Sequence, residues 1–332
     1  MSRVLEKELL SGLKTEDSYP VYQDISHLLT HPSDNGRLEI EFLGKSYPLQ
    51  PGVNFLQDGL AIAIPKLRLV QAFLVARQIL QSYLERGSQT GNDNVVAATA
   101  VLLLMDPEHL TAANTRKREI LSKSENGKPK RNVLEDEMNF VDTLLTSRLH
   151  RHTKSPTLWS HRRWLLGLWT SFAIPLNIQS DIRDVVMVAG ERHPRNYVAW
   201  HHARLLLGKE PHVAEEIAID IKEFCLRHHS DTSGWSFLNH TINLIEEEAR
   251  HKTCSLLLED ILKVTDSFRW TNESLWVFLR TVMATGYVSQ DIFESFVSVN
   301  KNLRSSLPKD SPQWQVLDKA MNWCTRYRMQ LV

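Results

Sequence analysis

Histidine and cysteine are the residues of this chain that could do the most demanding chemistry, as metal ligands, nucleophiles or bases. The chain has 14 His and 3 Cys among its 332 residues. No H-E-x-x-H motif or Cys/His cluster is present. Three pairs of histidines are too close in sequence for both members to share one helix face, namely His150 with His152, His201 with His202, and His228 with His229. We therefore expect no metal site in this chain.

Other catalytic patterns are also missing from the sequence. The only G-x-x-x-G spacing, from Gly87 to Gly91, lies in a polar stretch and does not resemble a phosphate-binding loop. The order of Ser, His and Asp residues does not assemble a triad. Cys225, Cys254 and Cys324 are isolated, as expected of buried thiols in a reducing cytosol. An independent active site inside this chain is not expected.

The helices that would position any functional side chains belong to a sequence repeat. One helical signature occurs five times, most clearly as P-R-N-Y-V-A-W-H-H-A-R-L-L-L in residues 194–207. We call the place of its tryptophan the tryptophan position. It is occupied in chain order by Ala113, Trp159, Trp200, Trp235 and Trp276. The intervals of 46, 41, 35 and 41 residues predict a stack of helical hairpins.

Residues around the tryptophan position indicate where each signature helix begins and which of its faces is buried. Four positions earlier, four of five residues are good N-caps, in the series His109, Ser155, Asn196, Asp231 and Asn272. Seven positions later all five are apolar, in the series Ile120, Leu166, Leu207, Ile242 and Met283. We therefore expect the four tryptophans to pack between hairpins rather than to stack on a ligand.

A basic residue follows the tryptophan position by four in four of the five copies. The series is Lys117, Arg163, Arg204, Asn239 and Arg280. This row could form a cationic face toward an acidic site on a partner. Such rows more often pair with carboxylates of the adjacent hairpin, and this is the interpretation that we favour.

The repeats are preceded by an N-terminal arm. Residues 1–66 lack the signature and form the first predicted segment, and residues 67–332 form a solenoid of helical hairpins, with signature repeats over about 95–285. In the arm, residues 21–29 predict a short helix, and residues 38–49 alternate like a strand or an extended arm. The charged stretch 122–132 predicts a mobile loop. Further helices are expected at 67–86, 95–105, 110–121, 135–149, 156–171, 181–192, 197–207, 213–228, 232–248, 253–264 and 273–285, with capping helices at 290–303 and 313–328.

Bulk composition narrows the functional class. The 39 basic residues balance 39 acidic ones, which disfavours binding to nucleic acid or to an anionic membrane. The longest apolar run, residues 95–105, is about half of what a bilayer crossing requires. The N-terminus lacks the apolar core of a secretory signal. These features predict a cytoplasmic protein without membrane insertion.

The signature resembles the repeat of the protein prenyltransferase alpha subunits. The resemblance lies in P-R-N-Y-V-A-W-H-H (194–202), L-W-S-H-R-R-W-L-L (158–166), N-E-S-L-W-V-F-L-R (272–280) and the acidic lead-in D-E-M-N-F (136–140). It implies an all-α fold, a right-handed α-α superhelix of hairpins around a beta subunit. In that family the beta subunit holds zinc and the isoprenoid. A cysteine of the target protein, bound to zinc as thiolate, attacks an allylic diphosphate.

The resemblance also implies which residues of this chain would face the diphosphate. The family's catalytic lysine lies two residues before the signature tyrosine, and this chain has Arg195 there, before Tyr197. Arginine keeps the charge and can bind a diphosphate through two nitrogens, but it cannot lose a proton. Arg195 and Tyr197 are therefore the expected catalytic donors. Further candidates for the diphosphate or the partner interface are Lys154, Arg163, His201, His202 and Arg204.

The resulting prediction is an alpha subunit that is inactive alone and transfers an isoprenoid to a C-terminal cysteine of a protein substrate. Geranylgeranyl transfer is favoured over farnesyl transfer, with the beta subunit otherwise used for Rab proteins as the favoured partner. We expect no cofactor in this chain, zinc in the beta subunit and an isoprenoid diphosphate as substrate. The alternative is a non-catalytic scaffold or chaperone for a beta subunit, which Ala113 and Arg195 would suit.

Overall fold

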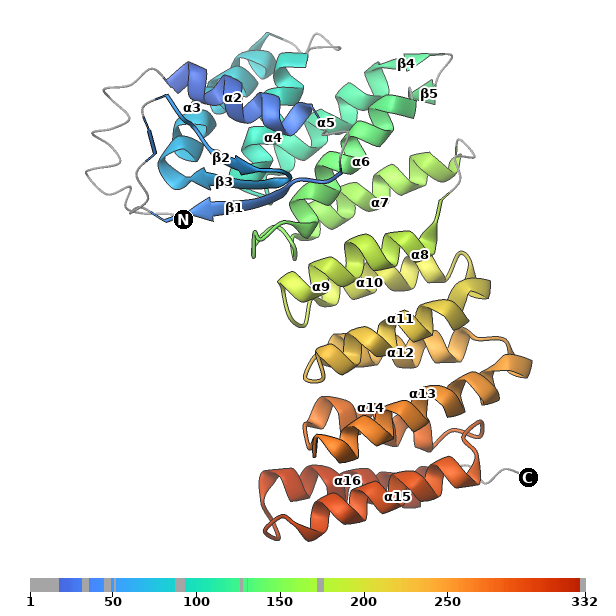
Figure 1. Ribbon diagram of the computed structural model, residues 1–332. Coiled ribbons are helices and arrows are strands. Elements are labelled where there is room, and N and C mark those ends of the chain that lie inside the picture. The colour runs from blue at the N-terminus through green and yellow to red at the C-terminus, as the bar shows by residue number, and fades with distance from the viewer. Residues whose placement is uncertain are drawn as a thin grey trace. The chain divides into compact units, whose positions relative to one another are not determined.

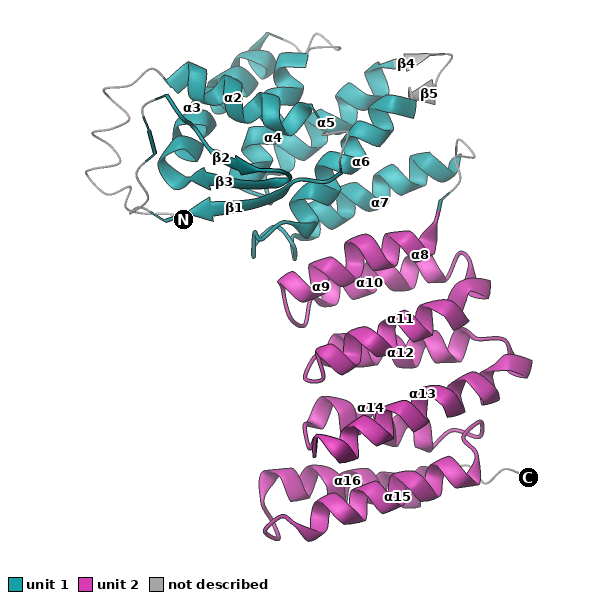
Figure 2. Cartoon of the chain, viewed as in Figure 1, with its two compact units in different colours: residues 1–176 teal, residues 177–332 magenta. Residues whose placement is uncertain are grey.

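Figure 1 shows the computed structural model of the chain, which describes residues 18–31, 36–44, 49–50, 52–86, 93–125, 128–129, 131–171 and 176–328. The chain divides into two compact units, residues 1–176 and 177–332 (Figure 2). Helical hairpins follow one another in both units, which confirms the predicted all-α solenoid class. Among the described residues, no helix is both long and apolar enough to cross a bilayer.

Unit 1 is built around the strongly apolar helix α4 (Asp93–Met105). This helix contacts α2 (Ser18–Thr30), α3 (Lys66–Glu85) and α5 (Leu110–Ser122), and eight of its residues are buried. A helix covered on several sides has no use for a polar face, which explains its continuous apolar sequence. The second hairpin of the unit is α6 (Arg131–Thr146) followed by α7 (Pro156–Ser171).

A small sheet joins the N-terminal segment to the second hairpin. Its order is β1 (Glu39–Leu43), β3 (Ala61–Pro65), β2 (Leu56–Asp58), with β1 parallel to β3 and β2 antiparallel to it. On the outer edge of β1, the Ile40 N–H donates to Ser147 Oγ (3.0 Å), and the Arg148 N–H donates to the Ile40 carbonyl (3.0 Å). These bonds between β1 and the residues that follow α6 attach the sheet to the second hairpin of unit 1.

The strand predicted over 38–49 is confirmed for residues 39–43, whereas residues 45–48 lie outside the described part of the chain. Strands β2 and β3 were not predicted. The segment expected to be a mobile loop contains the short antiparallel pair β4 (Ser124–Glu125) and β5 (Lys128–Pro129). The boundary at residue 66 stays a prediction of where the repeats begin.

Unit 2 consists of two layers of helices. The first-helix layer contains α8 (Ile178–Asp181), the π-helix η1 (Ile182–Met187) and α9 (Val188–Arg192), then α11 (Ala214–Arg227) after the 3-10 turn η2 (Pro211–Val213), α13 (Glu247–Ser267) and α15 (Gln290–Ser305). The second-helix layer contains α10 (Tyr197–Leu207), α12 (Thr232–Leu244), α14 (Glu273–Met283) and α16 (Pro312–Tyr327). Consecutive helices of the second-helix layer contact one another along the stack.

The signature tryptophans are all buried, and those of unit 2 lie between successive hairpins. The four residues are Trp159, Trp200, Trp235 and Trp276. In unit 2 each indole meets a phenylalanine of the next hairpin, with ring centroids 4.9–5.6 Å apart, in the pairs Trp200–Phe237, Trp235–Phe278 and Trp276–Phe296. Aromatic pairs at this separation favour one relative orientation of the two rings, and so help to fix the angle between hairpins.

Candidate functional site: the loop before helix α10

The signature helices share a capping arrangement at their N-terminal ends. Ser155, Asn196 and Asp231 each accept a hydrogen bond from a backbone N–H of the first helical turn, as predicted. His109 was not expected to cap, yet its Nδ1 accepts from the Ala112 N–H (3.1 Å). Asn272 was expected to cap, but its side chain donates to the His229 carbonyl instead (2.7 Å).

The cap residues also reach into the loop of the preceding repeat. Ser155 Oγ donates to the Pro107 carbonyl (3.1 Å), and Asn272 Nδ2 donates to the His229 carbonyl. Pro107 and His229 both lie six residues before a tryptophan position. Asp231 has no proton to donate, and its Oδ2 instead accepts from the backbone N–H of Arg195 (2.7 Å). The caps of α7, α12 and α14 therefore link their hairpins to the preceding one.

The loop before α10 differs from its counterparts for this reason. Three signature indoles donate from Nε1 to the carbonyl six residues earlier, at 2.8–2.9 Å, in the pairs Trp159–Thr153, Trp235–His229 and Trp276–Trp270. Trp200 Nε1, by contrast, is buried and has no hydrogen-bond partner among the described residues. Arg195 has φ +61°, a left-handed conformation that turns its N–H toward Asp231. The loop before α14 also holds a left-handed residue, Arg269 (φ +53°), although the next helix of the second-helix layer, α16, is capped by Ser311. The contact with Asp231, rather than the positive φ, therefore sets the α10 loop apart.

The predicted catalytic pair lies at the surface of this loop. Tyr197 begins α10 and is 73% exposed, and Arg195 is exposed as well. Neither side chain has a hydrogen bond or ion pair with another described residue. The N-terminus of α10 adds a partial positive charge at the same place. This arrangement suits the binding of an anion.

Two further candidates share a helix face with Tyr197. His201 and Arg204 follow it by four and seven residues, which places all three on one side of α10. His201 is exposed, whereas Arg204 is half-buried and donates from Nη2 to Ser236 Oγ of α12 (2.9 Å). Burial lowers the pKa of the Arg204 guanidinium. Arg195, Tyr197 and His201 thus lie in one exposed region, and their role at a diphosphate or a partner interface stays a prediction.

The remaining candidates lie elsewhere. His202 was expected at the partner interface or near the diphosphate, but it faces the interior of the hairpin and is buried. Its place one residue after the exposed His201 turns it by about 100° around the helix. Lys154 and Arg163 are exposed in unit 1, just before α7 and on α7.

The favoured interpretation of the basic row was wrong. None of Lys117, Arg163, Arg204 and Arg280 forms an ion pair with a carboxylate among the described residues. Three of them lie over an aromatic ring instead, at 4.8–5.6 Å from its centroid, in the pairs Lys117–Trp164, Arg204–Phe237 and Arg280–Trp323. Cation–π contacts of this kind need no carboxylate.

The buried ion pairs come from arginines one position earlier in the signature, Arg116 and Arg162, which the sequence analysis missed. Arg162 is fully buried, and its Nε donates to Asp142 Oδ1 (2.7 Å). Arg116 donates from Nε and Nη2 to the two oxygens of Glu137 (2.8 and 2.6 Å). Both arginines stand three residues after the tryptophan position, where the later copies have Ala203, Leu238 and Leu279. This change from Arg to apolar residues was the available signal.

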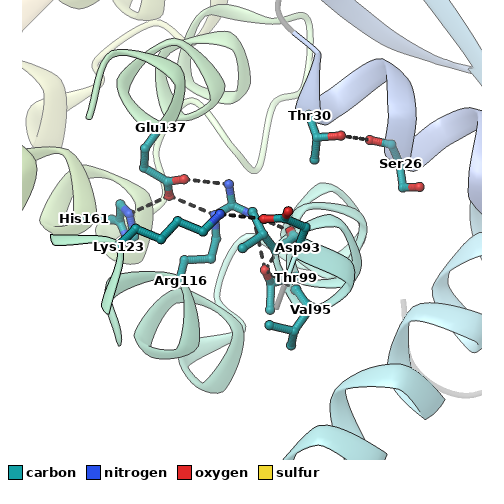
Figure 3. Close-up of polar contacts among 10 residues, drawn as sticks. Ser26, Thr30, Asp93, Val95, Thr99, Arg116, Lys123, Glu137 and His161 are labelled. Carbon is teal, nitrogen blue, oxygen red and sulfur yellow. Dashed lines mark hydrogen bonds and ion pairs between the residues drawn. The ribbon is translucent and has the colours of Figure 1, made fainter. Parts of the chain in front are cut away.

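Glu137 is the centre of a buried polar network in unit 1 (Figure 3). Arg116 also donates from Nη1 to the Val96 carbonyl (2.6 Å), and its guanidinium lies over the Phe140 ring. His161 Nε2 lies 2.8 Å from Glu137 Oε1. Burial acts to raise the pKa of Glu137, but Arg116 and His161 outweigh it and hold that pKa at about 2. The acidic lead-in D-E-M-N-F therefore supplies both the carboxylate and the ring that hold Arg116.

A cavity of about 1160 Å³ opens beside this network, between α2, α4, α5 and α6. Its lining carries both signs of charge, and most of these charges are already paired, as in Lys123 Nζ to Asp93 Oδ1 (2.6 Å). Within the residues that the structure describes, no three His, Cys, Asp or Glu side chains come together as a metal site would require. The cavity offers no nucleophile or base in a catalytic arrangement.

Comparisons with known proteins agree with the repeat geometry. Residues 134–169, which cover most of the α6–α7 hairpin, match the family model of the protein prenyltransferase alpha subunit repeat. Residues 158–268 match the ECM9 middle domain. The first match confirms the resemblance predicted from the signature, and the chain carries repeats of the protein prenyltransferase alpha-subunit type.

Three relatives illustrate this similarity. Protein prenyltransferase alpha subunit repeat-containing protein 1 of Homo sapiens is 30% identical over 178 residues, which cover 47% of this chain and 41% of that protein. Its counterpart in Danio rerio is 27% identical over 190 residues, covering 50% and 42%. Geranylgeranyl transferase type-2 subunit alpha of Candida albicans is 26% identical over 137 residues, covering 40% and 35%. The chain thus spans about two fifths of the length of the curated relatives it matches.

Proposed function

We propose that this chain is the helical-repeat subunit of a heterodimeric protein prenyltransferase, inactive alone and paired with a zinc-bearing beta subunit. Geranylgeranyl transfer and the beta subunit used for Rab proteins are favoured. The similarity to the type-2 alpha subunit of Candida albicans supports this choice.

The observation that carries the proposal is the Arg195–Tyr197 loop. Its backbone is fixed by Asp231, whereas the Arg195 and Tyr197 side chains are exposed. When the thiolate of the target cysteine attacks the allylic carbon, the bond to the diphosphate breaks and the diphosphate leaves with the electron pair. Arg195 and the Tyr197 hydroxyl would donate hydrogen bonds to its oxygens as charge develops there. The zinc of the beta subunit would bind the target cysteine and lower its pKa, so that the cysteine reacts as a thiolate.

The test is co-expression with each known prenyltransferase beta subunit, with the Rab-type subunit first, followed by transfer assays with labelled geranylgeranyl or farnesyl diphosphate. We expect a stable complex and transfer activity. Arg195→Ala should lower kcat about 10- to 100-fold without dissociating the complex, because it removes a charged donor to the leaving group. Arg195→Lys should recover part of the loss. Lys209→Ala, at an exposed position beyond the other end of α10, is the matched control.

The alternative function, a scaffold or chaperone for a beta subunit, is favoured by the arginine that stands where the family has its catalytic lysine. A complex that transfers equally well with Arg195→Ala would establish the scaffold. Failure to co-purify with any beta subunit would overturn both proposals.

A further inference from the structure

The second-helix layer of unit 2 carries cations that no carboxylate neutralises. Arg204 lies over Phe237 and Arg280 over Trp323, and neither guanidinium has an ion-pair partner among the described residues. The only carboxylates within α10, α12, α14 and α16 are Glu273 and Asp318. Asp318 is already paired with Arg304 (2.8 Å), so this layer is poor in available negative charge.

The first-helix layer of the same unit behaves differently. Its cations pair with carboxylates of the neighbouring helix, at 2.6–3.0 Å, in the pairs Arg183–Asp220, Lys222–Asp260 and Arg227–Glu191. Both layers belong to the same stack of hairpins and are exposed to the same solvent. The absence of ion pairs for Arg204 and Arg280 is therefore a property of the second-helix layer, and not of the repeat as a whole.

The unpaired cations meet exposed aromatic rings at the last hairpin. The Trp323 and Tyr327 rings lie 4.5 Å apart on successive turns of α16, and they are 37% and 49% exposed. Arg280 lies 4.8 Å from the Trp323 ring centroid, and Arg326 lies 5.8 Å from that of Tyr327. Arg280 Nε is buried, and no other described residue forms a hydrogen bond with it. We call these four residues, Arg280, Trp323, Arg326 and Tyr327, the C-terminal patch.

We propose that the C-terminal patch is a docking surface for an acidic segment of a partner protein, in which a carboxylate stands beside an apolar side chain. Trp, Tyr and Arg are the residues that most often carry the binding energy of protein interfaces. A carboxylate placed near Arg280 and Arg326 would meet two cations that form no ion pair with any acid of the described residues. The apolar side chain would cover the rings of Trp323 and Tyr327, which solvent now reaches.

A protein segment fits this surface better than a nucleic acid. The net charge of the chain is zero, so no long-range field draws a polyanion to it. Arg280 is half-buried against an indole and suits a single carboxylate rather than a run of phosphates. The inference does not depend on prenyl transfer, because any partner of this chemistry would meet the same patch.

The test uses the full chain and three labelled probes: a peptide of alternating Glu and Leu, the same peptide with Gln in place of Glu, and single-stranded poly-uridine. Fluorescence anisotropy at physiological salt measures each affinity. We expect the Glu peptide to bind at least about tenfold more tightly than the Gln peptide. The double variant R280Q/R326Q should lose at least about tenfold of that affinity. R183Q, in the ion-paired first-helix layer, is the matched control and should bind like the unchanged chain.

Arg326→Glu guards against misfolding, because Arg326 is exposed and its charge reversal removes no buried contact. It should weaken the Glu peptide more than the Gln peptide. Equal binding of the two peptides, unchanged affinity in R280Q/R326Q, tighter binding of poly-uridine, or no binding of the Glu peptide would each overturn the proposal. R195A should leave peptide binding unchanged, which separates this result from that of the transfer assay.

Discussion

Arg195 holds a left-handed backbone conformation that glycine adopts freely and that an arginine rarely adopts, and it does so in the exposed loop just before α10. A non-glycine residue with left-handed dihedrals costs roughly 1–2 kcal/mol. The hydrogen bond from its N–H to Asp231 offsets part of this cost. The side chain takes no part in that bond, so folding alone does not require an arginine here. Such strain at an exposed, charged position is typical of functional sites.

Replacing Arg195 by glycine should therefore separate stability from activity. Arg195→Gly should raise the free energy of unfolding by about 1 kcal/mol, because glycine adopts a positive φ without strain. Asp310→Gly is the matched control, since Asp310 has φ +65° in another loop of the same unit. Urea denaturation should show a gain for both variants, smaller for Asp310→Gly because aspartate tolerates the left-handed conformation better than arginine does. Only Arg195→Gly should reduce prenyl transfer in the assembled enzyme, and a fall in stability would contradict the strain argument.

Capping side chains act at the scale of whole hairpins. Asp231 accepts from two N–H groups of its own helix, those of Ser233 (2.9 Å) and Gly234 (3.0 Å), and from the N–H of Arg195 in the preceding loop. Ser289, by contrast, only accepts from the Ile292 N–H of its own helix. The two positions separate the cost of a cap from the cost of a link between hairpins.

Asp231→Ala should lower the free energy of unfolding by about 2 kcal/mol, of which about half is the lost cap and half the lost link to Arg195. Ser289→Ala should cost about 1 kcal/mol or less, because only a cap is lost. Urea denaturation followed by circular dichroism measures both. Equal losses in the two variants would show that the contact with Arg195 contributes nothing.

Long amphipathic helices were predictable from the sequence, and some hydrogen-bonding partners were not. Helices α7 and α10 begin and end at the predicted residues, because Pro156 and Asn196 mark their starts. The π-helical turn η1 was not predicted, since its buried residues follow the same apolar pattern as an α-helix. Strands β2 and β3 were missed because they are short and only some of their residues are buried.

For the candidate site, the sequence indicated which loop to consider, but not why its backbone takes a left-handed conformation. The position of Arg195 and Tyr197 follows from the repeat alignment, whereas the left-handed φ of Arg195 depends on Asp231, 36 residues away. The basic row was predicted to pair with carboxylates, whereas three of its members lie over aromatic rings. The spacing of basic residues in the sequence does not distinguish these two kinds of contact. His202 was misplaced because adjacent histidines offer no local signal of which one faces inward.

At the scale of the molecule, unit 1 should lose stability in mild acid. His152 of unit 1 is buried, and its Nε2 donates to the Leu104 carbonyl (2.8 Å). Burial lowers the pKa of His152 from 6.5 to about 4. The unfolded chain therefore takes up a proton at pH values where the folded chain does not. The resulting stability is fully present above about pH 6.5 and is lost as the pH falls to 4.

Between pH 7 and pH 5, His152 should cost unit 1 about 2 kcal/mol of its unfolding free energy. Hydrogen exchange followed by mass spectrometry, corrected for intrinsic rates, resolves the loss by region. His152→Gln keeps an N–H donor and cannot titrate, so it should remove this step. The low pKa of Glu137, about 2, predicts a second loss only below about pH 4.5. A step at pH 5–7 that persists in His152→Gln would contradict the assignment.

The N-terminal ends of the signature helices have a consequence for how such a chain can vary. There, the His229 carbonyl alone accepts from Trp235, Asn272 and Ser274. An inserted residue in that loop would break all three bonds at once. At the opposite ends, where α10 leads to α11 and α12 to α13, no described carbonyl accepts from the side chains of several residues, and the only described side chain that donates to the Ile245 carbonyl is that of Arg250. Insertions in related chains and engineered tags should therefore be tolerated better at these opposite ends. The loops at the N-terminal ends of the signature helices should keep a constant length, because their hydrogen bonds set the spacing of successive hairpins.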